Sequence, residues 1–449
     1  MHMRLTQGGD RAAMGNGGAP APRLGARTRT QSALRDRVAR PVPGASVGRP
    51  CGAGGRRDVR RAAFCGHGPA ESRAGLLVGR DIALVGGMGQ VGRRPIGGST
   101  STGADYLLTG HKFFCSAPMC DAFLVLARTD ADEISCFLVP RWQPDGTRNA
   151  LYIERLKDKL GNRSNASCEI EFPGTYGQLI GEEGRGSTSS GAMVAGHRLC
   201  GAESPAGFMR QALVQALHHT SHRRAFQKRL IDQPLMRAVL ADMAIEVEAA
   251  LALALRIARA MDNAEADASE AMLARIGTAV AKYWNCKRAP ALVFEALECH
   301  GGPGYIEDCI MPRLYREAPV NSIWEGSANM MALDVLRAVT REPGAAPAFF
   351  TELELARGDD AYLDRAIDDL RAELATRDGL EGRMRVIAEK MALTMQGALL
   401  TRHGAPEVAA AFCAARLGNN YRGTFGTLPA GCDLDAIIAR CAGMTVPRQ

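Results

Sequence analysis

Short apolar runs separated by turns begin at Tyr106 and continue to Phe172. The runs cover residues 106–109, 123–127, 134–139 and 168–172. Each has about five residues, the length and spacing typical of strands in a small β domain. We therefore predict a β domain in residues 101–186.

After about Phe208 the apolar positions recur with a helical period. Four segments are long enough for the helices of a bundle: 209–223, 234–261, 271–299 and 329–341. A second amphipathic block, from 362 to 416, follows them. We predict an α+β fold, in which a β domain precedes an antiparallel helical domain in 208–340 and a helical extension in 341–449.

The first hundred residues differ from the rest of the chain. They contain 17 Arg, no Lys, four Asp and one Glu, a net +12, whereas the whole chain carries +7. They also hold 21 of the 50 glycines and a single aromatic residue, Phe64, so they can bury little apolar surface. We predict that residues 1–100 are disordered or translated out of frame; a functional basic arm is the alternative.

Size and composition exclude a small module and a membrane protein. A chain of 449 residues with 46% apolar content can form two or three domains with their own cores. The 13 cysteines show no paired spacing, and no apolar run approaches the roughly 20 residues of a membrane helix. We expect a soluble, cytoplasmic protein without a membrane partner.

Glu325 is the only ionisable side chain in residues 318–329. A lone carboxylate among apolar and small residues is a candidate general base. It follows a glycine-rich turn, 301–304, at the end of a long helical pattern. The alternative is a surface carboxylate that pairs with Arg316.

Two segments resemble the acyl-CoA dehydrogenase family, and specifically its AidB branch, which is associated with the adaptive response to DNA alkylation. Residues 155–169 read Arg-Leu-Lys-Asp-Lys-Leu-Gly-Asn-Arg-Ser-Asn-Ala-Ser-Cys-Glu, and residues 313–327 read Arg-Leu-Tyr-Arg-Glu-Ala-Pro-Val-Asn-Ser-Ile-Trp-Glu-Gly-Ser. The resemblance extends over 106–180 and 208–449. It implies the family's fold, FAD as cofactor, an acyl-CoA-like thioester as substrate, and a homodimer or homotetramer.

The resemblance to this branch also implies a rival role, a DNA-binding protein of the alkylation response that retains flavin as structure. Residues 341–449 contain 13 basic and 15 acidic residues. Their bulk charge therefore gives no support for a DNA-binding surface in that region.

By the same resemblance, Glu325 is the base that removes the α-proton of the thioester while FAD accepts a hydride from Cβ. A carboxylate in water is a poor base for a carbon acid, so the role requires an apolar pocket. The neighbours Ile323 and Trp324 suit that requirement.

Two groups of residues match positions that contact the cofactor in the family. One follows the base and runs along the ribityl-pyrophosphate chain, and the other forms the glycine turn, where backbone N–H groups favour anionic phosphates. The residues are Gly326, Ser327 and Asn329 in the first group and Glu298, Gly301 and Gly302 in the second. Many relatives carry Gln at the position of Glu298. A carboxylate beside a pyrophosphate is unfavourable unless it is protonated or turned away.

Phe114 and Ser116 match the strand that lines the flavin, with Phe114 against the ring and Ser116 placed to hydrogen-bond near N5 or O4. On pattern alone, Phe113, Phe114 and Cys115 would be core residues.

Arg223 and Phe226 match residues that reach the FAD of a neighbouring subunit, which implies an oligomer built from dimers. Relatives usually have Gly at the position of Gln227. The alternative for Arg223 is an ordinary basic helix end.

Two segments depart from the family pattern. A Thr-Glu-x-x-x-Gly-Ser-Asp loop is expected just before Tyr106, where residues 86–100 read differently, and a helix is expected across 187–207, which is rich in Ser and Gly. We predict that both segments are read in a shifted frame, which would impair FAD binding and turnover. The hypothesis fails if the other two frames encode no Thr-Glu or Gly-Ser-Asp motif near position 90.

Overall fold

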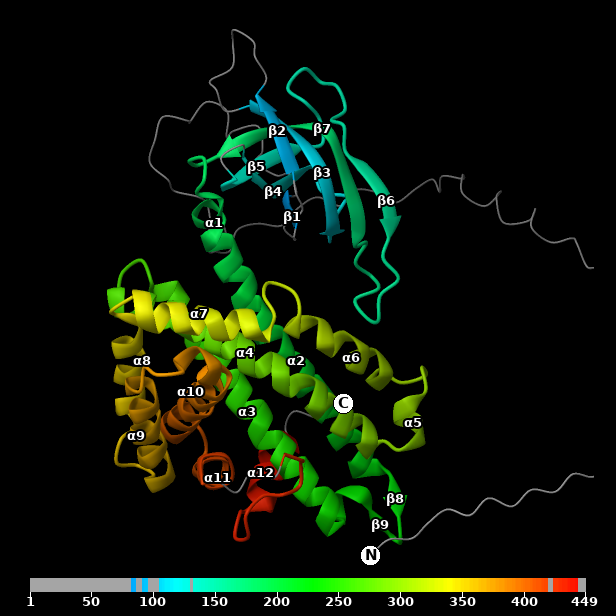
Figure 1. Cartoon of the computed structure of the whole chain (residues 1–449). Helices are drawn as coiled ribbons and strands as arrows, with labels where there is room; N and C mark the ends of the chain where they lie inside the picture. The colour runs from blue at the N-terminus through cyan, green and yellow to red at the C-terminus, as the bar shows by residue number, and fades with distance from the viewer. Residues whose placement is uncertain (1–81, 86–90, 96–104, 130–131, 419–422, 443–449) are drawn as a thin grey trace, which may run out of the picture. The chain divides into compact units, whose positions relative to one another are not determined.

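The computed structural model describes residues 82–85, 91–95, 105–129, 132–418 and 423–442 (Figure 1). All of them belong to one compact unit, residues 74–449. The prediction for residues 1–81 lies outside the described part of the chain.

The β domain is a single seven-stranded sheet (Figure 1). Its strands run in the order β1-β4-β5-β7-β3-β2, and β6 also pairs with β7. β1 and β4 are parallel, and the other pairs are antiparallel. The strands are β1 (Ile82–Val85), β2 (Val91–Pro95), β3 (Asp105–Cys115), β4 (Ala122–Arg128), β5 (Ile134–Pro140), β6 (Tyr152–Leu156) and β7 (Cys168–Ile180).

The four apolar runs of the sequence lie within β3, β4, β5 and β7, so these strands are confirmed. Residues 82–85 and 91–95 form β1 and β2, so the prediction of disorder for residues 1–100 does not hold there, while the out-of-frame alternative stays a prediction. These strands lie at the two ends of the sheet order. A strand at the edge is held by backbone hydrogen bonds to one neighbour and needs little apolar alternation of its own, which explains why Val91-Gly-Arg-Arg-Pro95 gave no signal.

The rest of the chain is helical. The long central helix α4 packs against α2, α3, α7 and α10 (Figure 1). The helices are α1 (Gly186–Ser189), α2 (Gly191–His222), α3 (Pro234–Asn263), α4 (Ala268–Cys299), α5 (Gly302–Tyr305), α6 (Met311–Glu317), α7 (Ala328–Arg341), α8 (Ala345–Glu354), α9 (Ala361–Ala375), α10 (Leu380–His403), α11 (Pro406–Phe412) and α12 (Leu434–Ala442). Three short turns, η2 (Leu230–Asp232), η3 (Ala318–Ser322) and the π-helical η4 (Cys413–Leu417), and a hairpin of β8 (Arg224–Ala225) and β9 (Lys228–Arg229) complete the described elements.

Two apolar cores hold the helices together. One joins α4 to α7, α8, α9 and α10, and the other joins α2, α3 and α4 to α11 and α12. The C-terminal extension therefore shares its cores with the bundle, and the α+β fold class is confirmed. None of the described helices combines the length and the apolar composition needed to cross a bilayer.

The segment 187–207 is not an interruption of the helical pattern, because α2 is continuous from Gly191. Its small residues let it approach α4 closely: a Cβ on Gly201 would lie 3.0 Å from Cε of Lys282. The carbonyl of Ala202 also accepts a hydrogen bond from Nδ2 of Asn285 (3.1 Å). Small residues pack well but give a weak apolar period, so the sequence pattern did not predict this part of the helix. The frame-shift hypothesis itself stays a prediction.

Candidate active site

Glu325 lies in the loop between η3 and α7. Its φ is +54°, in the left-handed region that residues other than glycine rarely adopt. The next residue, Gly326, has φ +108°, and a Cβ there would lie 2.6 Å from Cε of Met331. The loop therefore requires glycine at 326 and stores strain at Glu325, a pattern that recurs at functional sites.

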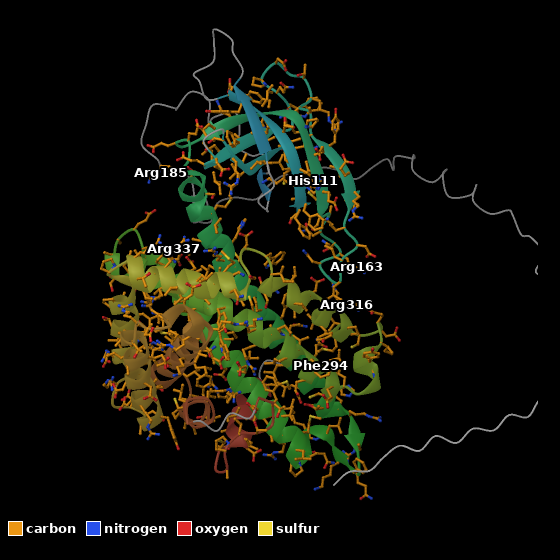
Figure 2. The ribbon with its side chains drawn as sticks, in the orientation of Figure 1. His111, Arg163, Arg185, Phe294, Arg316 and Arg337 are labelled. Atoms are coloured by element: carbon orange, nitrogen blue, oxygen red, sulfur yellow. The ribbon has the colours of Figure 1, made fainter. Side chains whose placement is uncertain are left out.

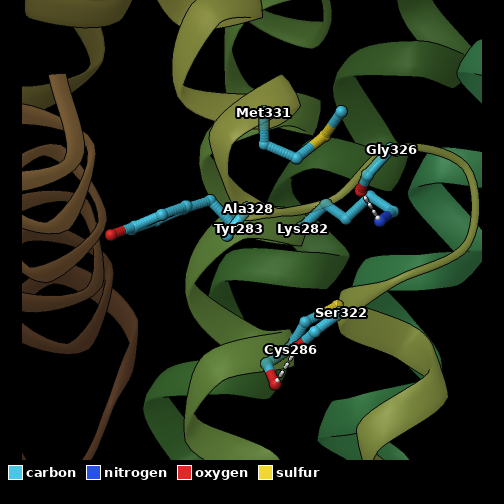
Figure 3. Close-up of a pocket in the computed structure, with 7 residues that line it drawn as sticks. All are labelled: Lys282, Tyr283, Cys286, Ser322, Gly326, Ala328 and Met331. Atoms are coloured by element: carbon cyan, nitrogen blue, oxygen red, sulfur yellow. Dashed lines mark hydrogen bonds between the residues drawn. The ribbon is translucent and has the colours of Figure 1, made fainter.

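A buried lysine donates hydrogen bonds to the backbone of this loop, one of which, to Gly326, is drawn in Figure 3. Nζ of Lys282, on α4, donates to the carbonyls of Trp324 (2.8 Å), Gly326 (2.8 Å) and Asn321 (3.3 Å). Lys282 is only 1% exposed. With Gly326 and Ala328 it lines a small pocket that has no room for a water molecule.

An ion-pair network holds the same loop from α2. Nε of Arg198 donates to the carbonyl of Glu325 (3.0 Å), and its Nη1 binds Asp334 on α7 (2.9 Å). Arg275 on α4 makes two further bonds to Asp334, at 3.0 and 3.2 Å. The backbone of three successive residues, 324–326, is thus fixed by cationic side chains.

The carboxylate of Glu325 is partly open to solvent. Its side chain is 26% exposed, and Nδ1 of His197 lies 3.6 Å from its Oε1. Arg316 pairs with Glu307 (2.6 and 2.9 Å), so the alternative in which it neutralises Glu325 is wrong. Ile323 and Trp324 are 67% and 38% exposed. Neither encloses the carboxylate as the sequence led us to expect.

The residues after Glu325 form the N-terminus of α7. Ser327 is its N-cap, but its side chain makes no capping hydrogen bond. Ser327 and Asn329 are both exposed. The first N–H groups of a helix lack intrahelical partners and attract anions, so this end can receive a phosphate.

The glycine turn is equally accessible. Gly301 has φ +64°, and a Cβ on Gly301 or Gly302 would meet nothing within 4 Å. A ligand could therefore approach this backbone closely. Glu298 is exposed at the end of α4, which leaves its carboxylate free to turn towards water.

On the sheet, a β-bulge decides which side chains face outward. The register of β3 against β7 shifts between Lys112 and Cys115. As a result Phe113 and Phe114 are both exposed, 56% and 45%, while Cys115 is fully buried. A bulge places two residues opposite one and re-aims side chains. The core alternative is therefore wrong for the two phenylalanines and right for Cys115.

Ser116 follows β3 and is exposed beside this aromatic pair. Nζ of Lys157 lies 3.0 Å from the ring centroid of Phe113 and 5.0 Å from that of Phe114. The charge of Lys157 is paired with Glu169, and its side chain is only 8% exposed. The surface around Phe114 and Ser116 thus offers aromatic faces and a hydroxyl, which fit a flat ring system.

Arg223 and Phe226 lie at the hairpin after α2. Phe226 is 92% exposed at the tip, with φ +50°, and Gln227 has φ +67°. Two successive left-handed residues make a type I′ turn, which favours glycine. The chain therefore adopts the turn despite Gln227. Arg223 is the exposed C-cap of α2.

The two segments that carry the family resemblance touch one another. The backbone N–H of Asn162 donates to Oε1 of Glu317 (2.8 Å), and Gly161 lies so close to the carbonyl of Arg316 that a Cβ would clash. Figure 2 labels one arginine from each segment, Arg163 and Arg316. These contacts join the β6–β7 loop to α6, which immediately precedes η3 and the Glu325 loop.

Three residues of this site escaped the sequence analysis: Lys282, Arg198 and His197. Lys282 stands in the largely apolar helical run 276–286, but the run itself does not reveal the backbone carbonyls that Lys282 binds. Arg198 and His197 belong to the segment that was read as a break. The structure groups Glu325, Gly326, Ser327 and Asn329 in one loop and helix start. The described contacts do not join this group to Phe114, Ser116, Arg223 or Phe226.

Two family models match the chain. The acyl-CoA dehydrogenase middle domain matches residues 96–175, and the acyl-CoA dehydrogenase C-terminal domain matches residues 184–340. Together they span more than half of the chain and include the segment 187–207.

Curated relatives agree with this match. AidB of Escherichia coli is 44% identical over 349 residues, which are 78% of this chain and 64% of that protein. Acyl-CoA dehydrogenase family member 11 of Caenorhabditis elegans is 32% identical over 329 residues, 66% of this chain and 53% of the relative. The chain spans less than two thirds of the length of either relative.

Solved structures show the same fold. Caenorhabditis elegans ACDH-11 in complex with C11-CoA has a TM-score of 0.68 at 28% identity, covering 75% of this chain and 64% of that one. An acyl-CoA dehydrogenase from Bacillus anthracis complexed with FAD has a TM-score of 0.60 at 17% identity, covering 81% and 70%; at this identity the likeness concerns the fold alone.

Proposed function

Because the chain belongs to the acyl-CoA dehydrogenase family, we propose that it is an FAD-dependent dehydrogenase of acyl-CoA-like thioesters. The observation that carries the proposal is the Glu325 loop, a strained carboxylate position fixed by Lys282 and Arg198. The open surfaces at Phe114, Ser116, the glycine turn and the start of α7 fit the cofactor.

Glu325 would act as the base that takes the proton from the α-carbon of the thioester. Bound FAD would supply the acceptor for the hydride from Cβ, so the acyl chain loses two hydrogens and becomes α,β-unsaturated. Gly326, Ser327 and Asn329 would hold the diphosphate through backbone and side-chain donors, and Glu298, Gly301 and Gly302 would form a second contact. Bound thioester and cofactor would exclude the water that now reaches the carboxylate.

The substrate class is supported by a structural relative. Caenorhabditis elegans ACDH-11 was solved with C11-CoA. We extend this to an acyl-CoA-like thioester for the present chain, without assigning a chain length.

Thioester-dependent bleaching of bound flavin tests this function. Under anaerobic conditions, acyl-CoA thioesters from butyryl-CoA to C11-CoA should bleach the flavin band of the wild type. Glu325→Gln should slow bleaching by about 10²- to 10⁴-fold, because the amide cannot accept the proton. Glu307→Gln is the control, since Glu307 pairs with Arg316 on the surface. Equal rates in Glu325→Gln and wild type would exclude Glu325 as the base.

We also propose a homodimer or homotetramer in which Arg223 and Phe226 reach the cofactor of a second subunit. The support is the exposed tip of the β8–β9 hairpin, where an almost fully exposed phenylalanine projects beside exposed Arg224 and Lys228. Aromatic and arginine side chains are both enriched at protein interfaces, and the hairpin presents both kinds.

DNA binding is the alternative role. Its support is the same hairpin, where Arg223, Arg224, Lys228 and Arg229 are all exposed. Binding through phosphate contacts should weaken steeply with salt, because counterions are released. Retention of duplex DNA that is lost as salt rises, and lost on Arg224→Ala, would support this role; no retention at low salt would exclude it.

We place the protein in the cytoplasm. The described cysteines are all free thiols, and most are buried. Free thiols persist in a reducing compartment.

A further inference from the structure

Lys282 is a fully buried cation whose described bonds all go to one loop. Its Nζ donates to the carbonyls of Asn321, Trp324 and Gly326, which lie on both sides of Glu325. An ammonium group has three protons, and three acceptors surround this one. The described ion pairs include none in which a carboxylate contacts Lys282.

A lysine in this position is costly for a purely structural residue. Burial lowers the pKa of Lys282; Cys286 and Glu325 act in the opposite direction, while Arg198 adds to the lowering. An apolar side chain of similar length would avoid the desolvation of the charge. We therefore expect the charged group to have a role that an apolar side chain could not perform.

The geometry of the loop supplies such a role. The carbonyls of residues 324 and 326 flank a backbone at φ +54°, a conformation that is unfavourable for a residue with a Cβ. Nζ of Lys282 holds both carbonyls at 2.8 Å. Without these bonds the loop could relax to a negative φ, which would re-aim the carboxylate.

We propose that Lys282 is a positioning residue for the reaction: its hydrogen bonds to the loop carbonyls hold Glu325 in the backbone conformation that directs its carboxylate at the substrate. This inference rests on the proposed function of Glu325. Lys282 does not touch the reacting atoms and acts only through the loop.

Lys282→Met tests the hold on the loop independently of activity, because Met keeps the length and removes the donors. The amides of Ile323 and Trp324 are hydrogen-bonded to the carbonyl of Val320, so their hydrogen exchange reports loop order. Exchange of a peptide covering 321–327 should rise about tenfold or more, while peptides from α7 should change little. Lys287→Met, an exposed lysine on the same helix, is the matched control.

A second variant keeps the test decisive if Lys282→Met does not fold. Lys282→Gln retains two donors on a shorter side chain, so it should give an intermediate rise in exchange. Loop exchange in either folded variant that equals that of Lys287→Met would overturn the proposal.

The kinetic arm separates positioning from general stability. In a wild type that is bleached by acyl-CoA, Lys282→Met should lower the limiting bleaching rate by about a hundredfold, with flavin content and the half-saturating thioester concentration unchanged. In a Glu325→Gln background the same change should cost nothing more, since the base is already absent. An undiminished loss there would contradict the proposal. If the wild type is not bleached while loop exchange still rises, the proposed function fails and the hold of Lys282 on the loop stands.

Discussion

Two lysines, Lys112 on β3 and Lys282 on α4, are almost completely buried. Each lies beneath a proposed functional surface, since Lys112 directly precedes Phe113 and Phe114, and Lys282 underlies the Glu325 loop. Nζ of Lys112 donates to the carbonyl of Leu126 (2.8 Å). Buried lysines make stability depend on pH.

Lys112 should destabilise the fold less as pH rises above about 8. Burial lowers its pKa from 10.5 to about 8. Between these values the unfolded chain binds more protons than the folded one, so the free energy of unfolding increases with pH. From pH 8 to 10.5 the free energy of unfolding of the wild type should therefore rise, relative to that of Lys112→Met, by up to about 3 kcal/mol. Urea unfolding of both proteins measures it, and a difference that stays constant with pH would contradict this account.

At the site, the sequence identified residues whose types carry the chemistry and missed those that position them. Glu325 stood out because a lone carboxylate interrupts an uncharged stretch, and Gly326, Ser327 and Asn329 were identified through the family resemblance. Lys282 acts on backbone carbonyls 39 to 44 residues away. Such a bond depends on tertiary structure and leaves no local pattern.

At the scale of elements, a buried ionic cluster fixes the C-terminal extension to the bundle. Arg416 of η4 contacts Asp242 and Glu246 of α3, and Glu246 also binds Arg288 of α4. Burial alone would raise the pKa of Glu246, but Arg288 and Arg416 hold it below its usual value. The N–H of Gly426 donates to Asp242 as well (2.9 Å).

Arg416→Ala should therefore destabilise the protein by about 3–5 kcal/mol, because it leaves two buried carboxylates short of a partner. Arg185→Ala is the control, since its pair with Glu182 is exposed on both sides (62% and 80%) and should contribute less than about 1 kcal/mol. Thermal or urea unfolding compares the two variants. Similar small losses in both would show that the cluster does not anchor the extension.

Strands and helices followed from the sequence where the apolar period was strong, as in β4 and α3. The exceptions have physical causes. β1 and β2 are edge strands, the start of α2 packs through small residues, and the bulge in β3 exposes Phe113 and Phe114 in succession. A periodic pattern cannot reveal a bulge, because the bulge breaks the period.

At the scale of the whole molecule, the family resemblance rested on two distant segments that the structure brings into contact through Asn162 and Glu317. The sequence could identify the fold through these segments. It could not establish the arrangement of subunits, because a single chain shows only an exposed hairpin.

Phe226→Ser should weaken self-association by about tenfold or more, since an exposed aromatic anchor is lost. Light scattering over a dilution series should show the wild type as a dimer or tetramer and the variant dissociating at higher concentration. Leu355→Ser, which removes another exposed apolar side chain (55%) after α8, should leave the association unchanged. An unaltered dissociation curve for Phe226→Ser would remove the hairpin from the interface.

The most direct test of the account is the visible absorption spectrum of the purified chain after addition of FAD and desalting. Despite the departures from the family pattern at 86–100 and 187–207, the account predicts a retained flavin band, because Phe114, Ser116, the glycine turn and the start of α7 are all open to the cofactor. A colourless protein would contradict it and would show that the chain does not assemble a flavin site.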